Sequence, residues 1–129
     1  MATTPQFAAS INIGSNAVSA SQDSSYTSPS HAVTIVTAGA NGTKIEEVVF
    51  AGIGTTVAGL VVLYLLDSSS TYHYFDSVVV TAVAPSTTAS PFRIVNSYPN
   101  LFLKSGWSLM ATSFSPSQFI NVIAFGGDY

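Results

Sequence analysis

The residues that could do chemistry in this 129-residue chain are few, and the first to consider are its two histidines, His31 and His73. Together with Asp67 and Asp76 they would offer imidazole and carboxylate ligands to a metal ion. His73 and Asp76 stand three residues apart in a predicted strand, so their side chains point to opposite faces. We therefore favour exposed or hydrogen-bonded histidines over a metal centre, and we expect no cofactor.

Acid–base and nucleophilic chemistry have equally little support. Glu46 and Glu47 are the one adjacent carboxylate pair, but neighbours in a strand face opposite ways unless a bulge intervenes, so they cannot flank one glycosidic bond. Solvation, or an ion pair with Lys44, is the simpler interpretation. No serine lies in a Gly-x-Ser-x-Gly pattern, and no helix start follows the glycine pairs at 52 and 54 or at 126 and 127.

Two further motifs have a structural explanation. Trp107, the one tryptophan, could stack on a sugar ring, but a core tryptophan beside Leu109 is the more common arrangement. The triplet Asn41-Gly42-Thr43 matches a glycosylation acceptor, and Asn-Gly is also a strong hairpin-turn signal. Because the first residues lack the basic and apolar regions of a secretory signal, we interpret the triplet as a turn.

The composition explains why chemistry is scarce. Only 7% of the residues are charged, against about 25% in an average globular chain, whereas 47% are hydrophobic, the formal net charge is −3 and cysteine is absent. A dispersed monomer needs surface charge, so this composition predicts a subunit that is covered by neighbours or wetted by Ser and Thr. It favours a structural or binding role over catalysis.

Two classes of partner are excluded by the same numbers. Three scattered cations give no electrostatic footprint for nucleic acid. The longest apolar run, at 60–66, is far shorter than the roughly 20 residues that a helix needs to span a bilayer. We therefore expect no nucleic-acid partner and no membrane partner.

The pattern of apolar runs predicts an all-β fold. Runs rich in Val, Ile, Thr, Tyr and Phe alternate with clusters of Ser, Gly, Pro and Asn. This is typical of an antiparallel β-sandwich or jelly-roll-like domain of about eight strands. The expected strands lie at 7–13, 32–37, 44–53, 58–66, 72–83, 92–95, 107–114 and 119–125, with a hairpin turn at 39–42 and another turn at Pro99-Asn100, which Leu101-Phe102-Leu103 follows.

The chain is expected to divide near residue 31. Residues 1–31 would form an N-terminal strand and a Ser-rich extended arm, in which Val18 and Tyr26 are the few anchors. A segment that cannot bury apolar area alone often becomes ordered only against a partner. Residues 32–129 would form the compact β-sandwich body.

Several predicted strands are apolar on both faces. Residues 60–66 and 78–80 do not alternate as a strand with one wet face does. The outer face is then covered either by the chain's own loops or arm, or by another subunit, and the sequence leaves both alternatives open. The side chains that would line a subunit interface are Phe7, Ile11, Ile13, Val62, Tyr64 and Leu66.

Four segments carry a family resemblance: Ala2-Thr3-Thr4-Pro5, the turn at 37–45, Leu63-Tyr64-Leu65-Leu66-Asp67, and the ending Ala124-Phe125-Gly126-Gly127-Asp128-Tyr129. Together they resemble small virion proteins encoded by tailed bacteriophages and prophages, over the first few residues and most of the chain from about residue 32 onward. The resemblance implies a capsid decoration (cement) protein on the outer surface of the phage head. Such a protein is made in the host bacterial cytoplasm, binds the major capsid protein and forms a homo-oligomer, often a trimer.

Two other classes of function stay open. An enzyme such as a hydrolase would need several titratable side chains in one cleft, and the sequence predicts no such cluster. A phage tail or fibre component, or a glycan-binding β-sandwich, would use aromatic side chains as stacking surfaces. The candidates for that role are Tyr72, Tyr74, Phe75, Tyr98 and Trp107.

Overall fold

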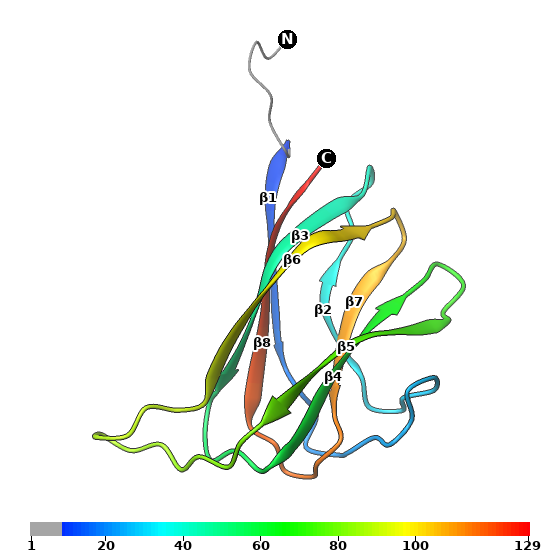
Figure 1. Ribbon diagram of the computed structural model, residues 1–129. Coiled ribbons are helices and arrows are strands. Elements are labelled where there is room, and N and C mark those ends of the chain that lie inside the picture. Colours follow the sequence, from blue (N-terminus) through cyan, green and yellow to red (C-terminus); the bar gives the residue numbers. More distant parts are fainter. Residues whose placement is uncertain (1–8) are drawn as a thin grey trace.

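The computed structural model describes residues 9–129, which form two four-stranded antiparallel sheets packed as a sandwich (Figure 1). This confirms the expected all-β class. Nothing helical in residues 9–129 has the length and hydropathy of a membrane span. The strands are β1 (Ser10–Ala17), β2 (Val33–Thr37), β3 (Thr43–Gly52), β4 (Gly59–Leu66), β5 (Tyr72–Val80), β6 (Arg93–Leu103), β7 (Ser108–Ser113) and β8 (Ile120–Asp128).

The strand order is that of a jelly roll. The first sheet has the order β1-β8-β3-β6 and the second sheet has the order β2-β7-β4-β5. The antiparallel pairs β1–β8, β2–β7, β3–β6 and β4–β5 are those of one long hairpin rolled up on itself. The pairs β3–β8 and β4–β7 then join these units within each sheet.

The core lies between the two sheets, because every second side chain of a strand points inward. In the first sheet Val48 lies opposite Ala124, and in the second sheet Val61 lies opposite Val78. All four side chains are buried in one continuous apolar cluster. Full burial of a large aliphatic side chain contributes about 1.5–3 kcal/mol, so this cluster is the main source of stability.

The turn at Gly39-Ala40-Asn41-Gly42 does not close a hairpin. The Gly42 N–H donates to the Gly39 carbonyl at 3.0 Å, so Ala40 and Asn41 are the central residues and the positive φ of 91° falls on Gly42. The strands on either side, β2 and β3, belong to different sheets. The hairpin expected over 32–53 is therefore wrong, because this turn carries the chain from one sheet to the other.

Strand β6 is continuous over Arg93–Leu103, where the sequence predicted one short strand at 92–95 and a turn at Pro99-Asn100. Its register with β3 jumps from Ser97 opposite Glu47 to Leu101 opposite Ile45, so a bulge accommodates residues 98–100. The proline is tolerated because β6 is an edge strand, where a missing N–H need not break a ladder. Pro99, which the sequence analysis interpreted as a turn signal, therefore lies in a bulge.

Strand β1 closes one corner of the sandwich. It pairs with β8 along its whole length, and the Val18 N–H continues the pairing to the Ile120 carbonyl at 3.0 Å. Gly14 approaches β2 so closely that a Cβ atom would lie 2.0 Å from the Ile35 carbonyl oxygen. The described part of the N-terminal strand thus belongs to the sandwich, and a boundary between separable units near residue 31 stays a prediction.

Replacing Gly14 with alanine should destabilise the protein by about 1–3 kcal/mol, because overpacking against rigid backbone carries a cost of this size. The added methyl group would meet the backbone of β2, which cannot move without disturbing its pairing with β7. Urea denaturation followed by circular dichroism measures the effect. Ser15→Ala, at the next and exposed position, is the matched control. Equal stability of the two variants would contradict close packing of β1 on β2.

Candidate interaction surfaces

The outer face of the second sheet is covered over β4 and β7 by the chain's own segment 18–32, while Val79 of the edge strand β5 stays exposed. Val62, Tyr64 and Met110 point away from the main core and are nevertheless buried. The Tyr64 hydroxyl donates to the Ser25 carbonyl at 2.6 Å, which bonds the segment to the sheet. Burial raises the pKa of Tyr64 to about 12. Of the two covers that the sequence left open, the structure shows the chain's own loop at these side chains.

A buried carboxylate holds this covering segment in place. Asp23 accepts hydrogen bonds from the backbone N–H groups of Ser30 (2.8 Å) and His31 (3.0 Å), and from the Thr112 hydroxyl of β7 (2.6 Å). Its own N–H donates to the Ser113 carbonyl at 3.0 Å. Burial acts to raise the pKa of Asp23, but the hydrogen bonds to the charged form outweigh it and hold the pKa below its ordinary value.

Both anchors predicted in the Ser-rich segment make tertiary contacts. Val18 is buried in the main core. The Tyr26 ring packs edge-on against Tyr74 and against Phe114, with centroid separations of 5.0 Å in each case. Segment 18–32 therefore packs on the second sheet through apolar rings as well as through hydrogen bonds. Figure 1 shows it, in blue to cyan, crossing from β1 in the first sheet to β2 in the second.

The outer face of the first sheet has no comparable cover among the described residues. Ile13 of β1 lies opposite Phe125 of β8, and Val49 of β3 lies opposite Val95 of β6. Directly opposite residues share one face, and Ile11 and Ile13 are 82% and 57% exposed on it. This surface is named the open face, and it consists of Ile11, Ile13, Val95, Ile123 and Phe125, while Val49 lies among them but is buried.

Charged side chains share this side of the sheet, because Glu47 lies opposite Phe125 and the exposed Arg93 lies two residues before Val95 on β6. Lys44 Nζ lies 2.9 Å from Glu46 Oε1, which confirms the expected ion pair. The register of β3 with both of its neighbours shifts between Ile45 and Glu47, so the two glutamates flank a bulge. A shallow pocket of about 420 Å³ beside this bulge is lined by Ala9, Ser10, Ile11, Glu46, Phe125, Gly126 and Gly127.

The six predicted interface residues fall into three groups. Ile11 and Ile13 lie on the open face. Val62 and Tyr64 are 0% exposed beneath segment 18–32, so they present no surface to a second chain, and Leu66 is half-buried. Phe7 lies outside the described residues.

Of the four side chains considered as metal ligands, His73 and Asp67 come together, whereas His31 and Asp76 lie in other clusters. His31 contributes to the Asp23 cluster, with Nδ1 3.2 Å from Oδ1. His73 Nε2 lies 2.9 Å from Asp67 Oδ2, and Asp76 accepts a hydrogen bond from a tyrosine hydroxyl at 2.7 Å. Across residues 9–129, no group of three or more His, Cys, Asp or Glu side chains is placed to hold a metal ion.

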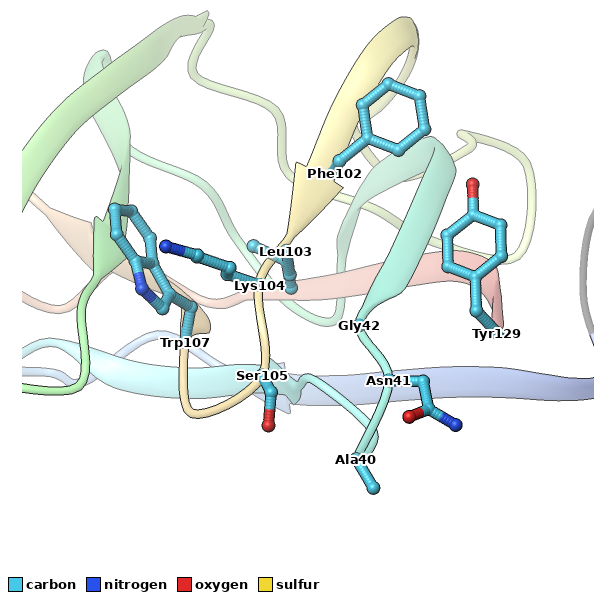
Figure 2. Close-up of a pocket in the computed structure, with 9 residues that line it drawn as sticks. All are labelled: Ala40, Asn41, Gly42, Phe102, Leu103, Lys104, Ser105, Trp107 and Tyr129. Atoms are coloured by element: carbon cyan, nitrogen blue, oxygen red, sulfur yellow. The ribbon is translucent and has the colours of Figure 1, made fainter.

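A second surface feature is an aromatic cleft between the β2–β3 turn and the β6–β7 turn (Figure 2). Phe102 and Tyr129 are 54% and 44% exposed there. Trp107 packs on the core, as expected from the sequence, and stacks on His73 with ring centroids 5.6 Å apart, but it also lines the cleft. The cleft has a volume of about 550 Å³ and is lined by Ala40, Asn41, Gly42, Phe102, Leu103, Lys104, Ser105, Trp107 and Tyr129.

Asp128 fixes one wall of this cleft and was not predicted from the sequence. Its Oδ1 accepts from the Thr43 hydroxyl at 2.5 Å and from the Asn12 amide at 2.8 Å. Thr43 Oγ1 in turn accepts from the Gly39 N–H at 2.8 Å, which ties the turn to β8. The hydrogen bonds from Thr43 and Asn12 hold the pKa of Asp128 below its ordinary value.

The sequence contains no clear signal for either structural aspartate. The Asp128 side chain bonds to residues 85 and 116 positions away, and Asp23 bonds to Thr112, 89 positions away. Only the pairing of distant strands brings these groups together. For the cleft, the one signal in the sequence is Phe102. This aromatic residue stands at an exposed strand position next to a turn that contains glycine.

Comparison of the chain with protein-family models, with curated proteins and with solved structures finds no match. The jelly-roll assignment therefore rests on strand order and pairing alone. Because this fold serves many unrelated functions, functional inference has to begin from the open face and the aromatic cleft.

Asp23→Asn should lower the free energy of unfolding by about 2 kcal/mol at pH 7, since hydrogen bonds to a charged group contribute on this scale. The folded-state pKa of Asp23 is below 3.8, so its stabilising effect is present above about pH 4 and is lost as the pH falls through the lowered value. Urea denaturation at pH 7 and near pH 2.5 measures the difference between variant and wild type.

The deficit of Asp23→Asn should be large at pH 7 and small near pH 2.5. Ser24→Ala, at the neighbouring exposed position, should match the wild type at both. A deficit of the same size at both pH values would show that the carboxylate charge does not hold the segment.

Proposed function

We propose that the protein is a structural subunit of a bacteriophage virion, a capsid decoration or cement protein that binds the major capsid protein and copies of itself on the outer surface of the head. The observation that carries the proposal is the open face. Segment 18–32 covers the β4 and β7 part of one outer face, where Val79 at the edge stays exposed, while the other outer face exposes Ile11, Ile13 and Phe125 together. Contiguous exposed apolar surface of this kind marks an interaction site.

That the protein belongs to a phage particle is inferred from the sequence resemblance. The surface by which it would contact its neighbours is inferred from the open face. A decoration protein needs a rigid body and an apolar contact surface, and the jelly roll with its few charges supplies both. Burial of Ile11, Ile13 and Phe125 against a neighbour would contribute up to about 1.5–3 kcal/mol for each side chain. We propose a homo-oligomer, a trimer, as the assembling unit.

A phage tail or fibre component that binds host glycans is the second candidate, and the aromatic cleft is the observation that favours it. Of the five aromatic residues expected to form stacking surfaces, only Trp107 lines this cleft. Tyr72 and Tyr74 lie on the second sheet, and Phe75 packs against Tyr98 with ring centroids 5.2 Å apart. The position of the protein on head or tail separates the two candidates.

Ile13→Asp should weaken self-association and binding to phage heads by at least about tenfold, or 1.4 kcal/mol, because it places a charge in the apolar contact. Sedimentation equilibrium of the full-length chain and co-sedimentation with assembled heads measure the two effects. Val79→Asp is the matched control, since Val79 is 67% exposed on β5 of the second sheet. This control should associate like the wild type.

A wild-type chain that stays monomeric and does not bind heads would contradict the proposal. Equal loss of association in Ile13→Asp and Val79→Asp would show that the contact is not specific to the open face. Labelling of tails in place of heads in micrographs would support the second candidate against the first.

A further inference from the structure

We propose that the aromatic cleft is a carbohydrate-binding site that holds one pyranose ring of a neutral glycan. The proposal does not depend on the particle to which the protein belongs. The ring would lie against Phe102 and Tyr129, and further hydroxyl groups of the glycan would bond to the other polar lining side chains, Asn41, Lys104 and Ser105, which point away from these two rings in Figure 2.

Both walls of the cleft are fixed by hydrogen bonds within the chain. The β2–β3 turn is closed by the Gly42 N–H donating to the Gly39 carbonyl at 3.0 Å, and Asp128 ties its end to β8. The β6–β7 turn is closed by the Trp107 N–H donating to the Lys104 carbonyl at 2.9 Å, with the positive φ of 85° on glycine. The site is therefore formed before a ligand arrives, as most small-molecule sites are.

Two aromatic side chains of the cleft, Phe102 and Tyr129, keep about half of their surface exposed. Leu101 and Leu103 of β6 are buried, whereas Phe102 between them points outward and is exposed. Lys44 Nζ lies 5.9 Å from the Phe102 ring centroid, and His73 stacks on Trp107 with an interplanar angle of 11°, so both rings have neighbours that orient them. The face of an aromatic ring carries negative charge density and attracts the C–H groups on one face of a pyranose.

The polar side chains of the cleft point to a ligand rich in hydroxyl groups. Within residues 9–129, Asn41, Lys104 and Ser105 make no side-chain hydrogen bond to the protein. Together an amide, an ammonium and a hydroxyl offer donors and acceptors to neutral hydroxyls. A purely apolar ligand would desolvate these groups without pairing them, which costs free energy.

Charge excludes two other ligand classes. Among residues 9–129 no carboxylate side chain lines the cleft, so the described lining offers a cation no carboxylate ligand. Lys104 is the one cationic side chain among the lining residues, which is too little charge for a phosphate-rich chain. The volume of about 550 Å³ lies within the roughly 300–1,000 Å³ typical of small-molecule sites. A neutral sugar ring, apolar on its faces and polar at its edge, satisfies all of these conditions.

The test uses the single tryptophan, because Trp107 lines the cleft and its fluorescence reports occupancy. Full-length protein is titrated with glucose, galactose, mannose, N-acetylglucosamine and their short oligosaccharides, and saturation-transfer NMR checks each sugar independently. We expect saturable binding of at least one probe with a dissociation constant near 1 mM or below, about −4 kcal/mol.

Phe102→Ala and Tyr129→Ala should each weaken that binding by about tenfold, and Asn41→Ala by a smaller factor. Phe119→Ala is the matched control, because Phe119 is 49% exposed but does not line the cleft. The open-face variant Ile13→Asp should bind sugar like the wild type, so failure of the proposed assembly role and failure of this site are distinguishable. Circular dichroism confirms that each variant is folded.

Absence of saturable binding to every probe by both methods would overturn the proposal. Sugar binding that persists unchanged in both Phe102→Ala and Tyr129→Ala would overturn it as well, because the ligand would then lie elsewhere on the molecule.

Discussion

The difference between the two outer faces of the sandwich depends on the buried carboxylate of Asp23 and on the segment that it holds. Asp23 binds two backbone N–H groups of its own loop and the Thr112 hydroxyl of β7, and so fixes segment 18–32 across the second sheet. The Tyr64 hydroxyl adds a second attachment point. As a result, the two apolar outer faces of the sandwich are not equivalent, because one is covered within the chain and the other is not.

This asymmetry gives the molecule two separate places for interaction. The open face is largely apolar and suits contact with large partners such as neighbouring subunits, whereas the aromatic cleft lies between two turns and suits a small ligand. The rigid double sheet holds both surfaces in place, and few charged side chains are needed for this. A chain with 7% charged residues is thus consistent with recognition through apolar surface and neutral hydrogen bonds.

The fold class could be predicted from the local pattern of apolar residues and turns. The errors in the prediction concerned which strands pair with one another. Alternating apolar runs and turn residues predicted an all-β sandwich, but Asn41-Gly42 reads alike whether the next strand pairs back or crosses to the other sheet. Likewise, an apolar run such as 60–66 has the same sequence whether a loop or a subunit covers it. Only distant contacts, such as Asp23 with Thr112, decide between these alternatives.

Covalent footprinting of the free protein and of the assembled particle with a carbene reagent tests the central claim most directly. The account predicts that labelling of Ile11, Ile13 and Phe125 falls strongly on assembly, that Val79 stays labelled, and that Val62 and Tyr64 are protected in both states. Strong labelling of Val62 and Tyr64 in the free protein, or unchanged labelling of the open face on assembly, would contradict it.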